Sequence, residues 1–373
     1  MPRMDFGTIL SQVETITNLN NQDTLIKNGI QWGLDQLTDF DLPYLMDESY
    51  ITTVAPYETG TVSVTNNSKT VTGSGTTFTA AMVGRKIRFA DQEAYYKIAT
   101  YSSATSITLE TVYAGDTLSG ETYSIYKDEY KLIADLDRYK VFRQVENGIA
   151  LGSIQASAFD IYDPMPSSAG DARYEVLVGT KLDTYTTGTV AGTVNASVLT
   201  GTSTSWTSVE GLSRGSRIVA DGYTYTVKSV DSDTQITIYE KLSTTLSADT
   251  YTVYLDNVIV LIKDIPTEVQ NIYYRYQRIP FPLINNNDIP DLPEKFHHLL
   301  VRYGLAYAWQ AKDKEEANKQ LIIATNGRAE MWQRIGSLSS IRSYRRRSMD
   351  YGESSSRTGQ PLPPSSYGIP IEL

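Results

Sequence analysis

Apolar residues recur at helical spacing near both ends of the chain. Residues 5–18 and 22–37 each present such a face, which predicts two helices. Ile16 is the last of the apolar residues that recur at helical spacing in the first helix. Gly29 and Gly33 lie within the apolar face of the second, so another helix is expected to pack closely against it. The apolar positions of the pair are Phe6, Ile9, Leu10, Val13, Ile16, Leu25, Ile26, Ile30, Leu34 and Leu37.

Two more helices are predicted near the other end. One begins after a polar turn at 285–288, with Asp288 in the turn, Asp291 as N-cap and Glu294 in the first turn, and runs to about Ala311. The second spans 314–335. In the first of these helices the residues expected to face inward are Phe296, Leu299, Leu300, Tyr303, Ala306 and Tyr307. The second helix carries the apolar residues Leu321, Ile322, Ala324, Ala329 and Trp332.

Between these ends apolar and polar residues alternate, as is typical of β-strands, and one sequence pattern occurs twice. Residues 57–128 and 186–256 share a Gly-Thr-Val start, a Thr-Gly-Ser/Thr turn and a Thr-Tyr-(Ser/Thr)-(Ile/Val)-Tyr close. The matching positions include Phe78 and Trp206, Ile87 and Ile218, and Ile107 and Ile236. The chain therefore carries two copies of a small all-β module, of barrel or sandwich type, and neither copy holds residues suited to catalysis.

The remaining strands fall in 129–185 and 257–279. In the strand 270–278, Tyr273 to Tyr276 form a stripe that is more typical of sheet packing than of base stacking. Without the modules, the helices of 1–50 and 257–336 and these strands could form one core. We therefore predict an α+β fold: a helical core with a small sheet, two inserted β modules at 57–128 and 186–256, and an extended arm at 337–373.

Composition limits the function. The 373 residues include no cysteine and two histidines, with a net charge of −10, so the bulk surface should repel nucleic acid. No apolar run is long enough to span a membrane. Residues 341–349, in contrast, contain four arginines and no acid. This cluster could contact a partner, DNA or only solvent; the arm is expected to order on binding.

The candidate catalytic and metal-binding groups are weak. His297 and His298 are adjacent and point in different directions, so packing is expected rather than metal binding. Asp135, Asp137 and Glu146 could include a carboxylate pair, but surface charge is the default reading. Gly73-Ser74-Gly75 lacks the Lys-Ser/Thr of a phosphate loop and predicts a tight turn. We expect no enzyme activity, no metal and no cofactor.

The order of the elements outside the modules resembles the head-to-tail adaptor family of tailed bacteriophages, also described as head completion or upper tail tube connectors. The match rests on the opening helix pair, the Tyr273-Tyr274-Arg275-Tyr276 strand, and the following helix, charged helix and tail. It also includes the proline-rich link Ile289-Pro290-Asp291-Leu292-Pro293-Glu294-Lys295-Phe296-His297.

The resemblance implies a ring, usually dodecameric, at the neck of a virion assembled in the host cytoplasm. The ring would join the portal protein to a downstream tail or nozzle protein and let DNA pass without sequence-specific binding. The modules could contact capsid or fibres. The arm would bind the portal through Arg342, Tyr344, Arg345, Arg346, Arg347, Tyr351, Tyr367, Ile369, Ile371 and Leu373.

Two other functions stay open from the sequence. The chain could be a trimeric tail fibre or receptor-binding protein whose β modules bind host glycans, which exposed aromatic platforms would favour. A carbohydrate-active enzyme with paired β modules is the third alternative.

Overall fold

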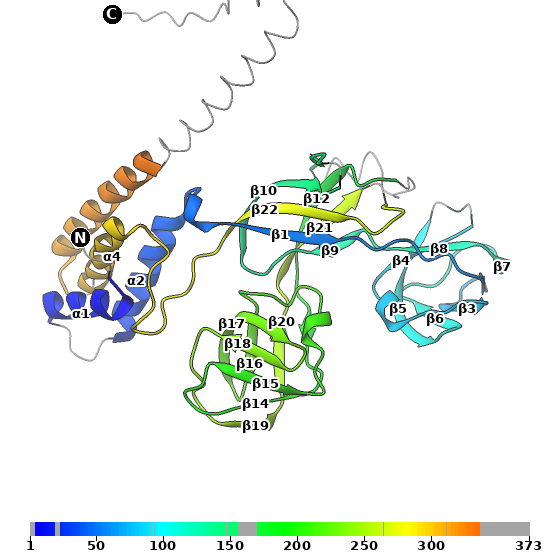
Figure 1. The fold of residues 1–373 in the computed structure, drawn as a ribbon, viewed down its shortest axis with the longest axis horizontal. Helices are drawn as coiled ribbons and strands as arrows, with labels where there is room; N and C mark the ends of the chain where they lie inside the picture. The colour runs from blue at the N-terminus through cyan, green and yellow to red at the C-terminus, as the bar shows by residue number, and fades with distance from the viewer. Residues whose placement is uncertain are drawn as a thin grey trace, which may run out of the picture. The chain divides into compact units, whose positions relative to one another are not determined.

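The computed structural model describes residues 4–18, 23–90, 92, 94–146, 148–155, 170–263, 265–310 and 312–335. The chain divides into two compact units. The helical unit comprises the described residues of 4–44 and 280–335, and the β unit comprises Leu45–Ile279 (Figure 1).

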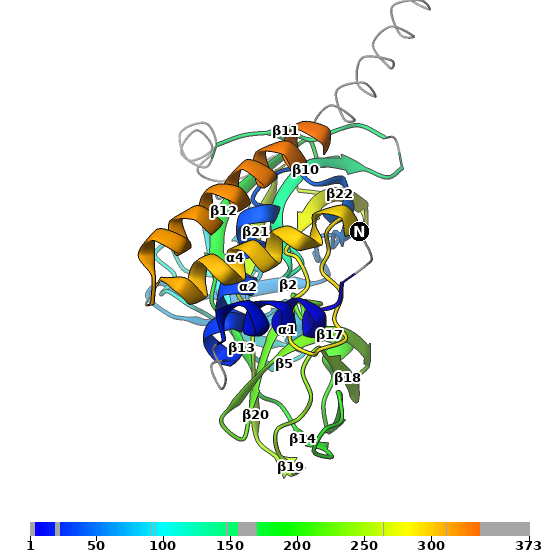
Figure 2. The same cartoon turned by 90° about the vertical axis from the view of Figure 1, so that its left-hand side faces the viewer.

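The helical unit contains α1 (Phe6–Thr17), α2 (Asp23–Thr38), α4 (His297–Trp309) and a helix over 314–335, all in view in Figure 2. Two 3-10 turns accompany them, η1 (Pro43–Leu45) and η4 (Glu294–Phe296). The Asp5 carboxylate caps α1 by accepting the Thr8 N–H at 2.8 Å, and Asn18 ends it in the left-handed conformation. The predicted helices are confirmed, and their ends agree to within about two residues, except that α4 begins at His297 and not directly after Asp291.

Glycine allows α2 to pack tightly on α4. A Cβ placed on Gly29 or Gly33 would lie 2.6 or 2.4 Å from the Cβ of Tyr307 or Tyr303, respectively, closer than two carbons can approach. Gly304 of α4 makes a similar approach to Val13 and Ile30. The predicted close approach of a second helix to the α2 glycines is confirmed.

The β unit is built on two facing sheets, which we call the central sandwich. One has the order β1-β22-β10 and the other β11-β12-β21-β9. Residues from both sheets form one buried core, among them Phe142, Tyr274 and Tyr276 from the first and Val260 and Ile262 from the second. The strands are β1 (Met46–Thr52), β9 (Glu129–Lys131), β10 (Leu136–Gln144), β11 (Gly152–Ser153), β12 (Tyr174–Lys181), β21 (Asn257–Lys263) and β22 (Asn271–Arg278).

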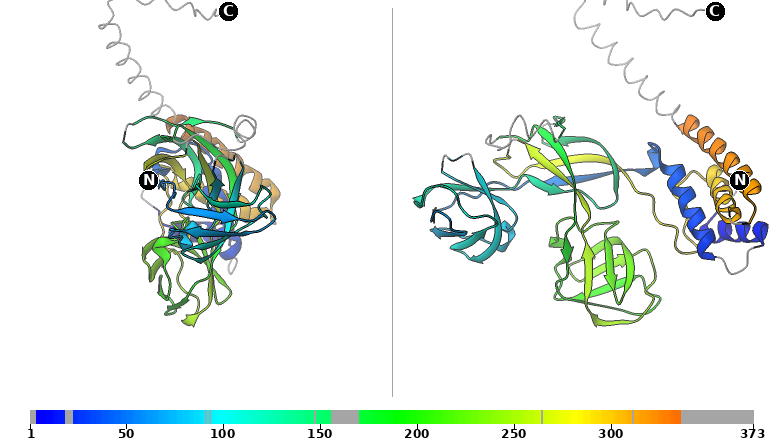
Figure 3. Two further views of the ribbon diagram at one scale, coloured as in Figure 1. Left: turned by 90° about the vertical axis from the view of Figure 1, so that its right-hand side faces the viewer. Right: turned by 180° about the vertical axis from the view of Figure 1, so that it is seen from behind.

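The two repeats form β modules of one topology, visible as rounded bodies in Figure 3. Module 1 has the strand order β7-β2-β3-β6-β5-β4-β8, and the equivalent strands of module 2 follow the same order. The outermost strands β7 and β8 are separated only by Thr122, so the same run of chain joins both ends of the sheet into a small barrel. Phe78 and Trp206 are buried at matching places in the two barrel cores.

Module 1 consists of β2 (Thr61–Val64), β3 (Thr70–Ser74), η2 (Ala80–Met82), β4 (Lys86–Phe89), β5 (Tyr95–Ser103), β6 (Ser106–Leu109), β7 (Leu118–Glu121) and β8 (Tyr123–Tyr126). Module 2 consists of β13 (Thr184–Tyr185), β14 (Thr189–Gly192), β15 (Val198–Thr202), η3 (Trp206–Ser208), β16 (Arg217–Ala220), β17 (Tyr223–Ser232), β18 (Gln235–Ile238), β19 (Leu246–Asp249) and β20 (Tyr251–Tyr254).

Backbone conformation repeats between the modules even where the residue type does not. Positive φ angles occur at the matching pairs Gly60 and Gly188, Asn67 and Asn195, Gly75 and Ser203, Gly84 and Gly215, Ala90 and Asp221, and Gly120 and Ala248. The turn geometry is therefore a property of the module, and module 2 holds a strained alanine where module 1 has glycine.

This difference predicts opposite effects of exchanging the two residues. Gly120→Ala should destabilise the protein by about 1 kcal/mol, because φ is +71° there and no other atom lies near the added Cβ. Ala248→Gly should stabilise it by a few tenths of a kcal/mol, since the more flexible unfolded chain offsets part of the relieved strain. Urea unfolding of both variants checks this, and a neutral Gly120→Ala would contradict it.

The predicted fold class is wrong. Strands account for 38% of the chain and helices for 24%, so the protein is mostly β and has no helical core with a small sheet. The strands of 129–185 and 257–279 pack on one another in the central sandwich, in a different unit from the helices. The reason lies in the side chains of these strands, because Phe142, Val260, Ile262, Ile272, Tyr274 and Tyr276 form one buried core that contains no residue of the described helices.

Candidate functional site

His297 fixes the start of α4 inside the helical unit. Its ring is fully buried, with Nε2 3.0 Å from the Leu292 carbonyl oxygen and Nδ1 2.9 Å from that of Met4. The imidazole thus ties the segment before α1 to the segment before α4, which confirms a packing role. Among the described residues, no group of three or more His, Asp or Glu is arranged to hold a metal ion.

The link 280–293 is fastened to α1. Asp288 closes the predicted turn by accepting the Ile284 and Asn285 N–H groups at 2.8 and 2.6 Å. The Phe6 N–H donates to the Asp288 carbonyl at 2.8 Å. Asp291, predicted as an N-cap, instead accepts the Phe281 N–H at 2.9 Å, and η4 begins after Pro293. The prediction failed because this carboxylate satisfies the backbone of the preceding link.

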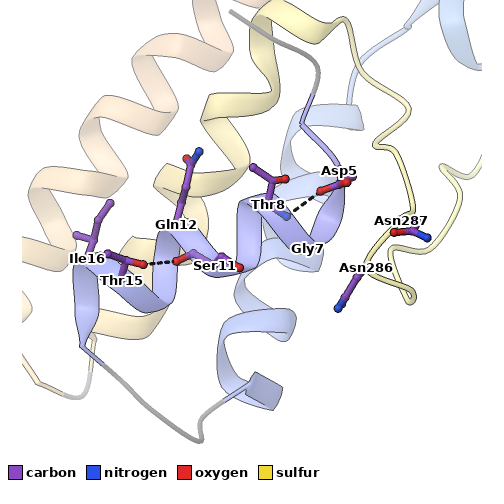
Figure 4. A pocket seen from close by; sticks show the side chains of 9 residues that line it. All are labelled: Asp5, Gly7, Thr8, Ser11, Gln12, Thr15, Ile16, Asn286 and Asn287. Carbon is purple, nitrogen blue, oxygen red and sulfur yellow. Dashed lines mark hydrogen bonds between the residues drawn. The ribbon is translucent and has the colours of Figure 1, made fainter.

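An open groove, which we call the α1 groove, runs along the outer side of α1 beside the turn at Asn286 and Asn287 (Figure 4). Its volume is about 690 Å³, and its lining includes Thr8, Gln12 and Ile16. Ile16 is 54% exposed, although it shares the helical spacing of the buried residues of α1. The α1 groove is therefore mainly polar, with one apolar side chain near its end.

The helix 314–335 presents a second surface, the Ile322–Ile323 patch. These side chains are 59% and 47% exposed. The buried face of the helix consists instead of Ala317, Ala324, Met331 and Ile335. Ile322 therefore faces away from the buried side of this helix, whereas Ala324 lies on it. Ala329 is also exposed.

Arg214 joins module 2 to the central sandwich, an arrangement we call the Arg214 clamp. Its Nε lies 2.5 Å from Asp135 Oδ2, and its Nη2 lies 2.6 Å from Asp47 Oδ2 and 3.1 Å from the Tyr276 hydroxyl. The Tyr276 O–H donates to the other Asp135 oxygen at 3.2 Å. One guanidinium in the loop between η3 and β16 thus holds two carboxylates of the sandwich.

Burial and pairing act against each other in the Arg214 clamp. Burial raises the pKa of Asp135, which is 5% exposed, although the Arg214 contacts partly oppose the shift. Burial opposes the charge of Arg214, but its hydrogen bonds with Asp47 and Asp135 outweigh that effect and raise its pKa. The Arg214 contacts therefore favour the ionised form of the buried aspartate.

The acidic residues that could have formed a carboxylate pair are engaged separately. Asp135 belongs to the Arg214 clamp, the Gln277 amide donates to Asp137 at 3.3 Å, and Glu146 accepts the Asn271 N–H at 3.2 Å. The default prediction of surface charge is wrong for Asp135, which is buried. Sequence reasoning missed Arg214 because its partners lie far away in the chain.

Two motifs have the structural roles that were predicted. Tyr274 stacks on Phe142 at 5.3 Å, and Tyr276 packs on Tyr274 at 5.7 Å, so the stripe is sheet packing. Gly75 follows β3 with a φ of +69°, as a tight turn requires. The predicted portal-binding residues Arg342, Tyr344, Arg345, Arg346, Arg347, Tyr351, Tyr367, Ile369, Ile371 and Leu373 lie outside the described residues, and their role stays a prediction.

The described residues define a modular protein, with a helical unit and a β unit that contains two copies of one small barrel. The family model of the SU10 adaptor protein matches residues 165–357, just over half of the chain, and the chain belongs to this family. It is therefore a phage adaptor protein, associated with the virion and with other virion proteins. The match includes module 2, whereas module 1 and the first two helices precede it.

No curated protein matches the chain. In the part of the chain that the structure describes, the helices are too short or too polar to cross a membrane.

Proposed function

We propose that the protein forms a ring, with twelve copies as the expected number, that joins the portal to the tail and surrounds the DNA exit channel. The observation that carries this proposal is the match to the adaptor family over 165–357. In the same proposal the ring lies at the neck of the virion. A tail or nozzle protein follows below it, and the β modules are free to meet capsid or fibres.

A closed ring needs two different surfaces on each copy, because a heterologous interface joins one face to another. The helical unit offers two such surfaces in the α1 groove and the Ile322–Ile323 patch. Exposed isoleucines on a helix gain free energy when a neighbour covers them. These surfaces support the helical unit as the part that closes the ring.

We also propose a structural rather than a catalytic role. Asp135, Asp137 and Glu146, the acids that suggested chemistry, are each held by an arginine, an amide or a main-chain N–H. The buried His297 is held by two main-chain carbonyls. Hydrolase assays on glycan substrates test this role, and turnover would contradict it.

Deleting residues 340–373 should abolish attachment to the portal and leave the fold intact. The deleted arm contains the arginine cluster and the apolar residues that end the chain, and the described contacts of both units are made without it. Co-purification with portal protein measures attachment, while circular dichroism and melting serve as the folding control. A truncated chain that binds portal normally would refute the role of the arm.

Reconstruction of purified particles tests the whole proposal. A ring of this chain directly below the portal, around the DNA channel, is the expected result. A peripheral position with three-fold symmetry would instead establish the tail-fibre alternative.

A further inference from the structure

Each β module ends in the same ion pair. In module 1, Lys86 Nζ lies 2.7 Å from Asp128 Oδ2, and in module 2 the equivalent Arg217 Nη2 lies 3.5 Å from Asp256 Oδ2. The loop before this pair is also equivalent, because Gly84 and Gly215 match in position and both have positive φ angles. The two loops can therefore be compared residue by residue.

Both loops carry an arginine, but among the described residues only Arg214 forms ion pairs. In module 2, Arg214 binds Asp135 and Asp47 of the central sandwich. In module 1, Val83 stands at that position and the arginine is Arg85, two residues further on. Arg85 is half-buried, yet within the described ranges its side chain makes no hydrogen bond and no ion pair, and the Glu210 carboxylate attracts it only from a longer distance. A half-buried guanidinium without an acceptor is costly to desolvate.

Arg85 lines a cleft of about 190 Å³ between the module 1 loop, the segment 127–131, and Asp183 and Glu210 of the module 2 side. The carboxylates of the cleft already hold lysines: Lys127 with Glu210 at 2.5 Å, Lys131 with Asp183 at 3.0 Å, and Lys97 with Glu129 at 3.6 Å. Arg85 and Lys181 are the lining cations that have no such partner among the described residues. The cleft therefore has an excess of positive charge in a chain of net charge −10.

We propose that the Arg85 cleft binds an aspartate or glutamate side chain of another protein chain in the virion. Arg214 shows within the same molecule how this loop of the module holds carboxylates. A guanidinium takes a carboxylate through two parallel hydrogen bonds, and Lys181 adds a second positive charge. This proposal requires that the protein contacts another protein chain in the virion, and it does not require that the copies form a ring.

The geometry favours a protein carboxylate over DNA. The cleft is large enough for a side chain, and its four acids, Asp128, Glu129, Asp183 and Glu210, would face any polyanion brought against it. Duplex DNA carries about one negative charge per 1.7 Å of its axis, so it would set many phosphates against these acids. A single carboxylate can instead approach Arg85 and Lys181.

The test compares phage that carry Arg85→Glu with phage that carry Arg88→Glu, a matched charge reversal on β4 of the same module. Copies of the chain per purified particle are counted by quantitative mass spectrometry, and the melting of each isolated protein controls for folding. Arg85→Glu should lower incorporation at least about tenfold, because a desolvated charge pair becomes a repulsion, whereas Arg88→Glu should match the wild type. Equal incorporation of both variants would overturn the proposal.

If the isolated Arg85→Glu protein melts at a lower temperature than the wild type, the comparison is made with Arg85→Gln. We expect a smaller loss of incorporation for Arg85→Gln. A reconstruction of wild-type particles provides a measurement that does not depend on any variant. A carboxylate of another chain within about 4 Å of the Arg85 guanidinium supports the proposal. A DNA phosphate there, or no group from another chain, overturns it.

Discussion

Replacing Gly33 by valine should destabilise the helical unit by about 3 kcal/mol or more. The Cβ alone would lie 2.4 Å from the Tyr303 Cβ, and the two methyl groups of valine would add to the overlap. Tyr303 cannot move aside easily, because it is buried and its ring meets that of Trp32 at 5.3 Å. The steric overlap can therefore be relieved only if α2 and α4 move apart, which exposes the apolar surface between them.

Asn28→Val is the matched control. Asn28 lies on the same helix and is exposed, so this variant introduces the same β-branched residue without the clash. Its effect should stay within about 0.5 kcal/mol. Urea unfolding monitored by circular dichroism at the helical band measures both variants. Similar midpoints for the two would show that α2 and α4 are further apart than the structure has them.

Arg214→Ala should cost about 3–5 kcal/mol in the β unit, because it leaves the buried Asp135 carboxylate without its cation. Arg217→Ala is the control, since the Arg217 pair with Asp256 is half exposed and should contribute less than about 1 kcal/mol. Denaturant unfolding gives both values. Hydrogen exchange across residues 210–216 shows whether module 2 has come loose from the central sandwich.

The loss in Arg214→Ala should depend on pH in a defined direction. Burial raises the folded-state pKa of Asp135 above its ordinary value, and removing Arg214 raises it further. A raised carboxyl pKa contributes stability below the unfolded pKa, and this contribution is lost as pH rises through the folded pKa. The variant should therefore be closest to the wild type near pH 4 and furthest from it near pH 7. A deficit that grows as the pH falls would show that Asp135 is not the group left unpaired.

The local elements were predictable because their signals are local. The helical spacing of Phe6, Ile9 and Leu10 and the break after Thr17 are set by nearby residues, and α1 follows them. The repeated motifs likewise led to two β modules of one topology. Ile16 and Ile322 show the limit, because they have the right spacing for a buried face and are nevertheless exposed.

The sequence by itself determined the helices near the two ends, the duplicated β module, the close approach to the α2 glycines and the resemblance to phage adaptors. Only the tertiary structure decided that the remaining strands pack on one another, that Asp135 is buried with Arg214, and that the Arg85 side chain forms no hydrogen bond or ion pair among the described residues. The physical reason is the separation along the chain of the residues that determine each feature. Periodicity, turns and repeated motifs depend on residues that are neighbours in the sequence. Packing partners depend on side chains that are far apart in the sequence and meet only in the folded chain, as Asp47 and Arg214 do.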